Sequence, residues 1–256
     1  MDPDALLQLV IVLVSGLVAG FINTMAGGGS FITLAALEFA GLPIGIANGT
    51  NRIAIQIQNI MAILGFKSKG LADYKSSLEL AIPATIGAIV GAFVVIDLPE
   101  DIFHKVLGVA MLLMLATLLF DSKKLLRPRE IIMTPTRRVW GYLVLFAVGF
   151  YGGAIQAGVG FLMMAALLLV LGESLVRTNM HKVLIVGLYT MAALIIFAAK
   201  GQVDWGFGIV LCIGNGAGAW IASRMAVAKG DNIVKIVLAI MLAVMAVRYL
   251  GLITGF

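Results

Sequence analysis

Residues 20–31 read GFINTMAGGGSF, and residues 149–161 read GFYGGAIQAGVGF. Each stretch lies inside a long apolar block, at 5–40 and at 139–171, so a glycine cluster interrupts a run that would otherwise form one helix. A break at membrane depth persists only where protein or a water-filled cavity receives the freed backbone polar groups. Two breaks in corresponding halves of a chain predict the binding site of a transporter.

The composition places this chain in a membrane. Of its 256 residues 61% are hydrophobic and 12% are charged, with a mean hydropathy of +1.08, whereas soluble domains carry roughly 25% charged residues. Several apolar stretches approach the ~20 residues that a spanning helix needs. The sequence therefore predicts an all-α polytopic integral membrane protein of 8–10 helices. Cys212 is the only cysteine, which excludes an intrachain disulfide. The acidic start predicts that no signal peptide is cleaved.

The segments predict two related halves. Beside the two broken blocks, spans are expected at 47–65, 77–96, 103–120, 181–199, 205–223 and 232–253. A basic, proline-containing linker at 121–138 separates an N-terminal repeat (1–120) from a C-terminal repeat (139–256). Matching pieces recur at nearly constant offset: 70–74 resembles 201–205, Gly87 and Gly91 match Gly214 and Gly218, and 51–53 lies opposite 181–183. Such a recurrence is typical of a duplicated unit.

Lysine and arginine orient the halves, because these residues favour the cytoplasmic side. Most of the 18 fall in loops at 66–76, 121–138, 171–182 and 224–235, which we therefore place inside. Both termini are then extracytoplasmic, and each broken block enters and leaves on one side as a re-entrant hairpin. The second half is inverted relative to the first. The alternative is that each block is one long kinked span, which gives a parallel repeat.

Each glycine cluster precedes a short helix whose first turn offers unpaired N–H groups and a positive dipole end. Two inverted hairpins would bring both ends to the bilayer midplane and form a small anion site. The polar residues that open the following helices would add to it. The expected substrate-binding residues are Asn23, Gly27, Gly28, Gly29, Ser30, Asn48, Asn51, Arg52, Tyr151, Gln156, Gly158, Gly160, Thr178, His181 and Lys182.

Alternative interpretations exist for several of these residues. Arg52 and Lys182 would serve an anion, or they would extend to lipid headgroups from helix ends. The Gly16–Gly20, Gly87–Gly91 and Gly214–Gly218 pairs are interpreted as helix packing. At least one of Gln56, Gln58 and Asn59 is expected to face inward. Asp73 and Asp204 are interpreted as helix caps. Enzyme motifs are absent, and Ser30 with His181 is the only nucleophile–base pair that we considered.

The stretch 20–30, continued by 47–52, resembles the N-terminal signature of the TauE/SafE sulfite exporter family, also called the 4-toluene sulfonate uptake permease family. Residues 149–153 and 201–205 look like its second-half marks, and the resemblance covers essentially the whole chain. One departure is that 157–160 is less glycine-rich than usual. The resemblance implies secondary transport of sulfite, thiosulfate or organosulfonates across a bacterial or archaeal cytoplasmic membrane.

We therefore expect a secondary transporter that moves a small sulfur-containing anion by alternating access. The alternatives are an anion channel and a carrier of a small carboxylate. The expected partners are a small anionic substrate and the lipid bilayer, without nucleic acid, cofactor or metal. A coupling proton or ion and a homodimer stay open.

Overall fold

The computed structural model describes residues 3–72, 74–119, 134–237 and 240, and the secondary structure of these residues is helical throughout. The first half contains α1 (Pro3–Met25), α2 (Ser30–Phe39), α3 (Ile44–Lys67), α4 (Tyr74–Val95) and α5 (Glu100–Leu119). The second contains α7 (Pro135–Ala154), α8 (Val159–Leu171), α9 (Leu175–Ala199) and α10 (Trp205–Lys229), and residues 231–237 are also helical.

The helices α3, α4, α5 and α9 begin earlier than the predicted spans, whereas α10 begins at Trp205 as predicted. Caps fix two of these N-termini: Ser174 Oγ accepts a hydrogen bond from the amide of Arg177, and Asp204 Oδ1 accepts one from Phe207. The capping role expected of Asp204 is thereby confirmed. Asp73, residues 120–133 of the linker region and most of the last predicted span lie outside the described residues, and residues 135–138 already belong to α7.

Glycine pairs bring the helices of the two halves into close contact. A Cβ at Gly218 of α10 would overlap the carbonyl oxygen of Leu17 on α1, and one at Gly91 of α4 would overlap that of Phe150 on α7. Gly20 and Gly153 face their partner backbones in the same way. The packing interpretation of these pairs is confirmed, because small residues let helix backbones approach closely.

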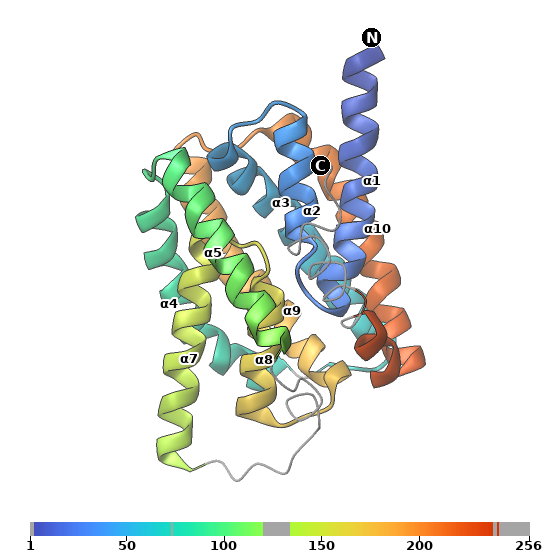
Figure 1. The fold of residues 1–256 in the computed structure, drawn as a ribbon. Coiled ribbons are helices and arrows are strands. Elements are labelled where there is room, and N and C mark those ends of the chain that lie inside the picture. Colours follow the sequence, from blue (N-terminus) through green and yellow to red (C-terminus); the bar gives the residue numbers. More distant parts are fainter. Residues whose placement is uncertain (1–2, 73, 120–133, 238–239, 241–256) are drawn as a thin grey trace.

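At both glycine breaks the chain reverses its direction. Gly29 at the start of α2 packs on the backbone of Ala19 in α1. At the second hairpin, Arg137 near the start of α7 donates a 2.8 Å hydrogen bond from Nη2 to the carbonyl of Leu169 near the end of α8. A single kinked span would hold these ends far apart, so that alternative is wrong. In Figure 1, α1 runs down from the marked N-terminus and α7 runs up from the lower edge.

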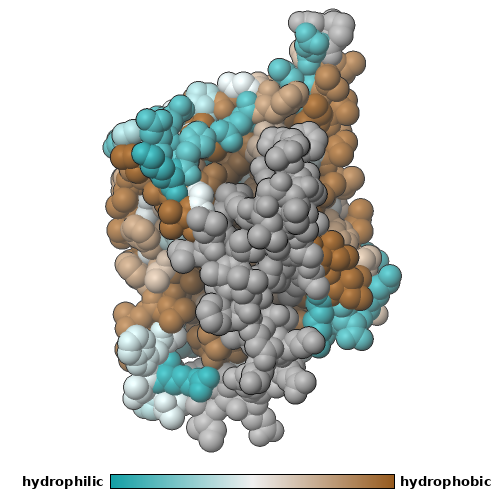
Figure 2. All heavy atoms as spheres, in the orientation of Figure 1, coloured by the Kyte–Doolittle hydropathy of each residue, from teal (hydrophilic) through white to brown (hydrophobic). Residues whose placement is uncertain are grey.

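The surface of the molecule is that of a membrane protein. Figure 2 shows an apolar band between polar patches at the upper and lower ends of this face. Ile82, Ile195 and Ile213 each expose more than half of their side-chain area. By length and composition the segments Asp4–Met25, Lys75–Val95, Leu175–Ala199 and Trp205–Lys229 can cross a membrane. The α2 and α8 arms, of 10 and 13 residues, extend only about 15–20 Å, less than the ~30 Å hydrocarbon core.

A methyl group at the α4–α7 contact should destabilise the fold. Gly91→Ala forces its Cβ into the backbone of α7, and we expect it to lower the free energy of unfolding by about 1–3 kcal/mol. Gly108→Ala is the matched control, since its Cβ would meet nothing within 4 Å and a helical Gly→Ala change stabilises by about 0.5–1 kcal/mol. Thermal unfolding in detergent measures both, and equal melting temperatures would contradict the proposed contact.

Candidate functional site

The two helix breaks touch each other at the centre of the molecule. A Cβ at Gly160 would lie 2.8 Å from Cα of Gly27, and one at Gly27 would overlap the backbone of Gly160 and Phe161. Gly27 and Gly28 have φ of +94° and +93° and turn the chain at the first break. Gly158 has φ of +74° and turns the chain at the second break. Gln156 has φ of +64° although it is not glycine, a backbone strain that is typical of functional sites. The second break thus forms with fewer glycines than the first.

Side chains of α3 donate hydrogen bonds to the carbonyl groups at the end of α7. Arg52 donates from Nη1 to Gly152 O at 3.1 Å, and from Nη2 to Gly153 O at 2.6 Å and Ala154 O at 3.0 Å. Asn48, one turn earlier on α3, donates to Ala154 O at 2.8 Å. These are the last carbonyls of a broken helix, which have no partner of their own, and a cation there also complements the negative end of the helix dipole.

In the same manner, side chains of α9 donate hydrogen bonds to the carbonyl groups at the end of α1. Lys182 Nζ donates to Asn23 O at 2.9 Å and to Thr24 O at 3.1 Å, and Asn179 donates to Met25 O at 2.8 Å. Each half therefore supplies a cation and an asparagine to the broken helix of the other half. The alternative that Arg52 and Lys182 extend to lipid headgroups is wrong, because the two side chains are buried.

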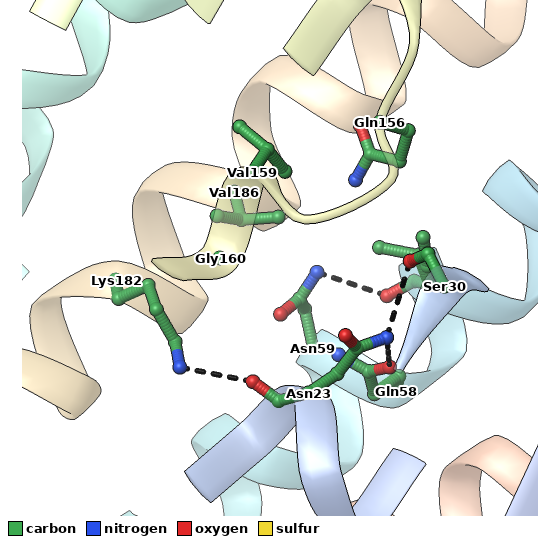
Figure 3. A pocket seen from close by; sticks show the side chains of 10 residues that line it. Asn23, Ser30, Gln58, Asn59, Gln156, Val159, Gly160, Lys182 and Val186 are labelled. Atoms are coloured by element: carbon green, nitrogen blue, oxygen red, sulfur yellow. Dashed lines mark hydrogen bonds between the residues drawn. The ribbon is translucent and has the colours of Figure 1, made fainter. Parts of the chain in front are cut away.

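A cavity lies where the breaks meet (Figure 3). It has a volume of about 20 Å³, room for about one water. Five of the residues expected from the sequence line it, namely Asn23, Ser30, Gln156, Gly160 and Lys182. The remaining lining residues are Ile55, Gln58, Asn59, Val159 and Val186. Gln58 and Asn59 thus confirm that mid-span polar residues of α3 face inward.

The lining is rich in hydrogen-bond donors. Lys182 has three ammonium hydrogens, of which the carbonyls of Asn23 and Thr24 take two. The Ser30 hydroxyl accepts from Asn23 Nδ2 at 3.3 Å, which leaves its own hydrogen for another acceptor. In the part of the chain that the structure describes, the amides of Ser30 and Gly160 have no backbone acceptor. Lys182 is the one charged residue in this lining, so the cavity favours an anion.

The other expected residues build the surroundings of the cavity. Asn51 Oδ1 accepts from Thr33 on α2 at 2.8 Å, and Tyr151 donates to Ala157 O at 2.6 Å within the second break. Gly27, Gly28 and Gly158 form the turns, Gly29 directly precedes α2, and Thr178 is buried in the first turn of α9. His181 lies apart from the lining residues and contacts Ser77 and Glu173 instead. Asn48 and Arg52 belong to the capping of α7.

Sequence reasoning missed Asn179 as a site residue. It stands 131 positions after Asn48 and performs the corresponding task on α1. The repeat offset carried the signal that could have identified it.

A second cavity of about 200 Å³ lies between the start of α3, the α4–α5 turn and the end of α9. Phe197 lines this cavity, and the Arg52 guanidinium lies over its ring at 4.3 Å from the centroid. Gln202 and Glu100 are polar residues on its wall, while most of the lining is apolar. Phe197 therefore contacts both this second cavity and the Arg52 guanidinium that caps α7.

Removal of the Arg52 guanidinium should destabilise the second break. Arg52→Met leaves the carbonyls of Gly152 and Gly153 without their donor, which costs about 1–3 kcal/mol for each buried acceptor. Arg224→Met is the matched control, because Arg224 also lies over an aromatic ring, that of Trp220 at 5.1 Å, yet is partly exposed. Thermal unfolding in detergent should show a large decrease for Arg52→Met alone. Similar decreases for both variants would contradict the capping role.

Comparisons with known proteins agree with this architecture. The chain is 29% identical over 243 residues to "Probable membrane transporter protein ORF9" of Sinorhizobium sp, covering 95% of this chain and 92% of that one. It is 28% identical over 240 residues to a "Probable membrane transporter protein" of Haemophilus influenzae, covering 94% and 93%. The "Probable membrane transporter protein YfcA" of Escherichia coli K12 is 29% identical over 251 residues, covering 95% and 90%. No solved structure matches.

The family described as "Sulfite exporter TauE/SafE" matches residues 12–249, nearly the whole chain. This confirms the resemblance seen in the glycine signature, and it makes the chain a transporter rather than an enzyme. The chain is thus a multi-pass membrane transporter that belongs to the TauE/SafE sulfite exporter family.

Proposed function

We propose that this protein is a secondary transporter that moves a small sulfur-containing anion, such as sulfite, thiosulfate or an organosulfonate, across the cytoplasmic membrane. The observation that carries the proposal is the central cavity between the first turns of α2 and α8, which combines Lys182, the Ser30 hydroxyl and free amides. Helix N-termini attract anions through their amides and their dipole. A compact oxyanion matches a set of donors that converge from several directions.

The transport cycle that we propose is alternating access between two inverted halves, 1–120 and 139–256, joined by the linker at 121–138. Support comes from the equivalent contacts: α1 packs on α10 as α7 packs on α4, and α3 caps α7 as α9 caps α1. The opposite directions of α1 and α7 in Figure 1 fit this arrangement.

We place the basic loops, and with them the lower end of Figure 1, on the cytoplasmic side. Lys182 no longer supports this orientation, since it is buried within α9 and bonds to α1. The remaining basic loops do, and they put both termini on the outer side. The second cavity, which Phe197 lines, would then be the approach from outside.

A cavity of about 20 Å³ is too small for an anion of four or more heavy atoms. Binding therefore requires the two hairpins to separate. They are suited to such a movement, since Gly27 and Gly160 meet without side chains. Arg52 and Lys182 link each hairpin to the opposite half, so a displacement of one half is transmitted to the break of the other.

A thermal-shift screen should identify the anion class. Thiosulfate, sulfite or an organosulfonate should raise the melting temperature, because a ligand that binds only the folded state stabilises it. Small carboxylates should have a weaker effect. A larger stabilisation by carboxylates would refute the proposed substrate class.

Labelled thiosulfate in proteoliposomes should show counterflow, which a channel does not produce.

Ser30→Ala should weaken that ligand effect without unfolding the protein. A hydrogen bond to a charged group contributes about 1.5–3 kcal/mol, so the affinity should fall roughly tenfold or more. Ser223→Ala is the matched control, because Ser223 is also buried but donates to Trp220 O on its own helix. Titration of the thermal shift measures both variants. Equal affinities would show that the anion binds elsewhere.

A further inference from the structure

A buried histidine connects three parts of the chain. His181 on α9 has no exposed surface. Its Nδ1 lies 2.7 Å from Oγ of Ser77 on α4, and its Nε2 lies 3.0 Å from Oε2 of Glu173 in the turn between α8 and α9. The Glu173 side chain is 28% exposed. A continuous hydrogen-bonded chain therefore extends from a carboxylate near the surface to a hydroxyl on a neighbouring membrane helix.

Three of the described charged residues lie close to the hydrogen-bonded series at the start of α9: Arg177, Lys182 and Asp231. Arg177 Nε lies 3.5 Å from Glu173 Oε2, and its side chain is 48% exposed. Lys182 follows His181 directly, but its ammonium group bonds to α1. Asp231 accepts a hydrogen bond from the amide of Val176 in the first turn of α9.

The helices packed against α9 carry further charged side chains, which bond to other residues or are exposed to solvent. On α4, Lys75 and Glu79 flank Ser77 and are exposed. Glu79 Oε1 lies 3.9 Å from Nε of Arg138 on α7. Arg137, also on α7, donates to a carbonyl of α8. On α3, Arg52 caps α7 and Lys67 is exposed. The sequence of α8 contains no charged residue, and the one in described α1 is Asp4, in its first turn. Asp73 lies outside the described residues.

The geometry allows a proton to move between water and the ring. A proton from water binds Glu173, its O–H bond breaks as an N–H bond forms at Nε2, and a carboxylate facing an imidazolium is left. The neutral ring that accepts this proton carries its hydrogen on Nδ1, so Nδ1–H donates to Ser77 Oγ before and after the transfer. The reverse transfer returns the proton through Glu173 to water. Ionisable groups inside membrane helices commonly form such proton relays, since an ionisable residue is costly to keep there.

We propose that His181, reached through Glu173, is a proton-binding site that couples proton movement to transport. An imidazolium on α9 adds positive charge to this helix, one residue before Lys182, the cation of the central cavity. Its charge also strengthens the hydrogen bond that Nδ1–H donates to Ser77 on α4. The coupling rests on the proposed anion transport, whereas proton binding at His181 does not.

Proton binding can be measured without any substrate. The chain has two histidines, so His104→Gln leaves His181 as the single ring for ¹⁵N-histidine NMR in nanodiscs. We expect the signals of the ring nitrogens to change with pH as the ring gains its second proton. Glu173→Gln removes the facing carboxylate and should alter this pH dependence. A ring that keeps one protonation state throughout would overturn the proposal.

Coupling is tested in proteoliposomes with labelled thiosulfate. His181→Gln should retain counterflow, which needs no net proton movement, and should lose uptake driven by a pH gradient. Glu173→Gln is a second, milder variant, and His104→Gln is the control, since His104 bonds at the exposed end of α5 to Glu38 and should leave both modes unchanged. Gradient-driven uptake that survives in His181→Gln would overturn the coupling. Absence of counterflow in the native protein would instead contradict the proposed substrate class, and the NMR titration would stand.

Discussion

The structure depends on the hydrogen bonds that six backbone carbonyl groups accept. Two helices stop at membrane depth, and the last three carbonyls of each, 23–25 and 152–154, face no water that could bond to them. Arg52 with Asn48 receives one set, and Lys182 with Asn179 receives the other. Because the donors come from the third helix of the opposite half, the breaks can exist only when both halves are assembled. The packing of α3 and α9 through the centre of the protein follows from this requirement.

The same constraint accounts for the character of the site. A guanidinium and an ammonium are brought into the core to satisfy backbone carbonyls, and they make that core positive. Arg52 commits most of its donors to α7, with Nε left unpartnered. Lys182 keeps one hydrogen and faces the cavity. The Lys182 ammonium is therefore the cation that can both stabilise the α1 break and bind a ligand, so anion binding and the stability of that break depend on one group.

Much of the fold could be predicted from the sequence, because lipid leaves few options. Apolar length predicted the spans, and the glycine clusters predicted the breaks. The spaced glycines predicted close helix packing, but not that α1 packs on α10 and α4 on α7. The recurring motifs predicted a duplication, and the glycine signature resembled the family that the comparison over nearly the whole chain shows. The loop charges predicted an orientation, which stays a prediction.

The site was less accessible from the sequence, since its contacts join residues more than 100 positions apart. The sequence selected Arg52 and Lys182 as substrate ligands, and it did not reveal that they cap the broken helices of the opposite half. His181 was selected with them because it adjoins Lys182 in sequence, yet successive residues on a helix point in different directions, and its ring meets Ser77 and Glu173. The positive φ of Gln156 could not be foreseen, because nothing local to a glutamine favours it.

The exchange of caps between the halves limits what one half could do alone. A chain of half this length, carrying α1 to α5, would hold Arg52 and Asn48 without the helix end that they serve, and a broken helix without its donors. Under the inverted arrangement proposed above, such a half would be complete only when paired with a second copy of itself inserted in the opposite orientation, which is the arrangement of a dual-topology dimer.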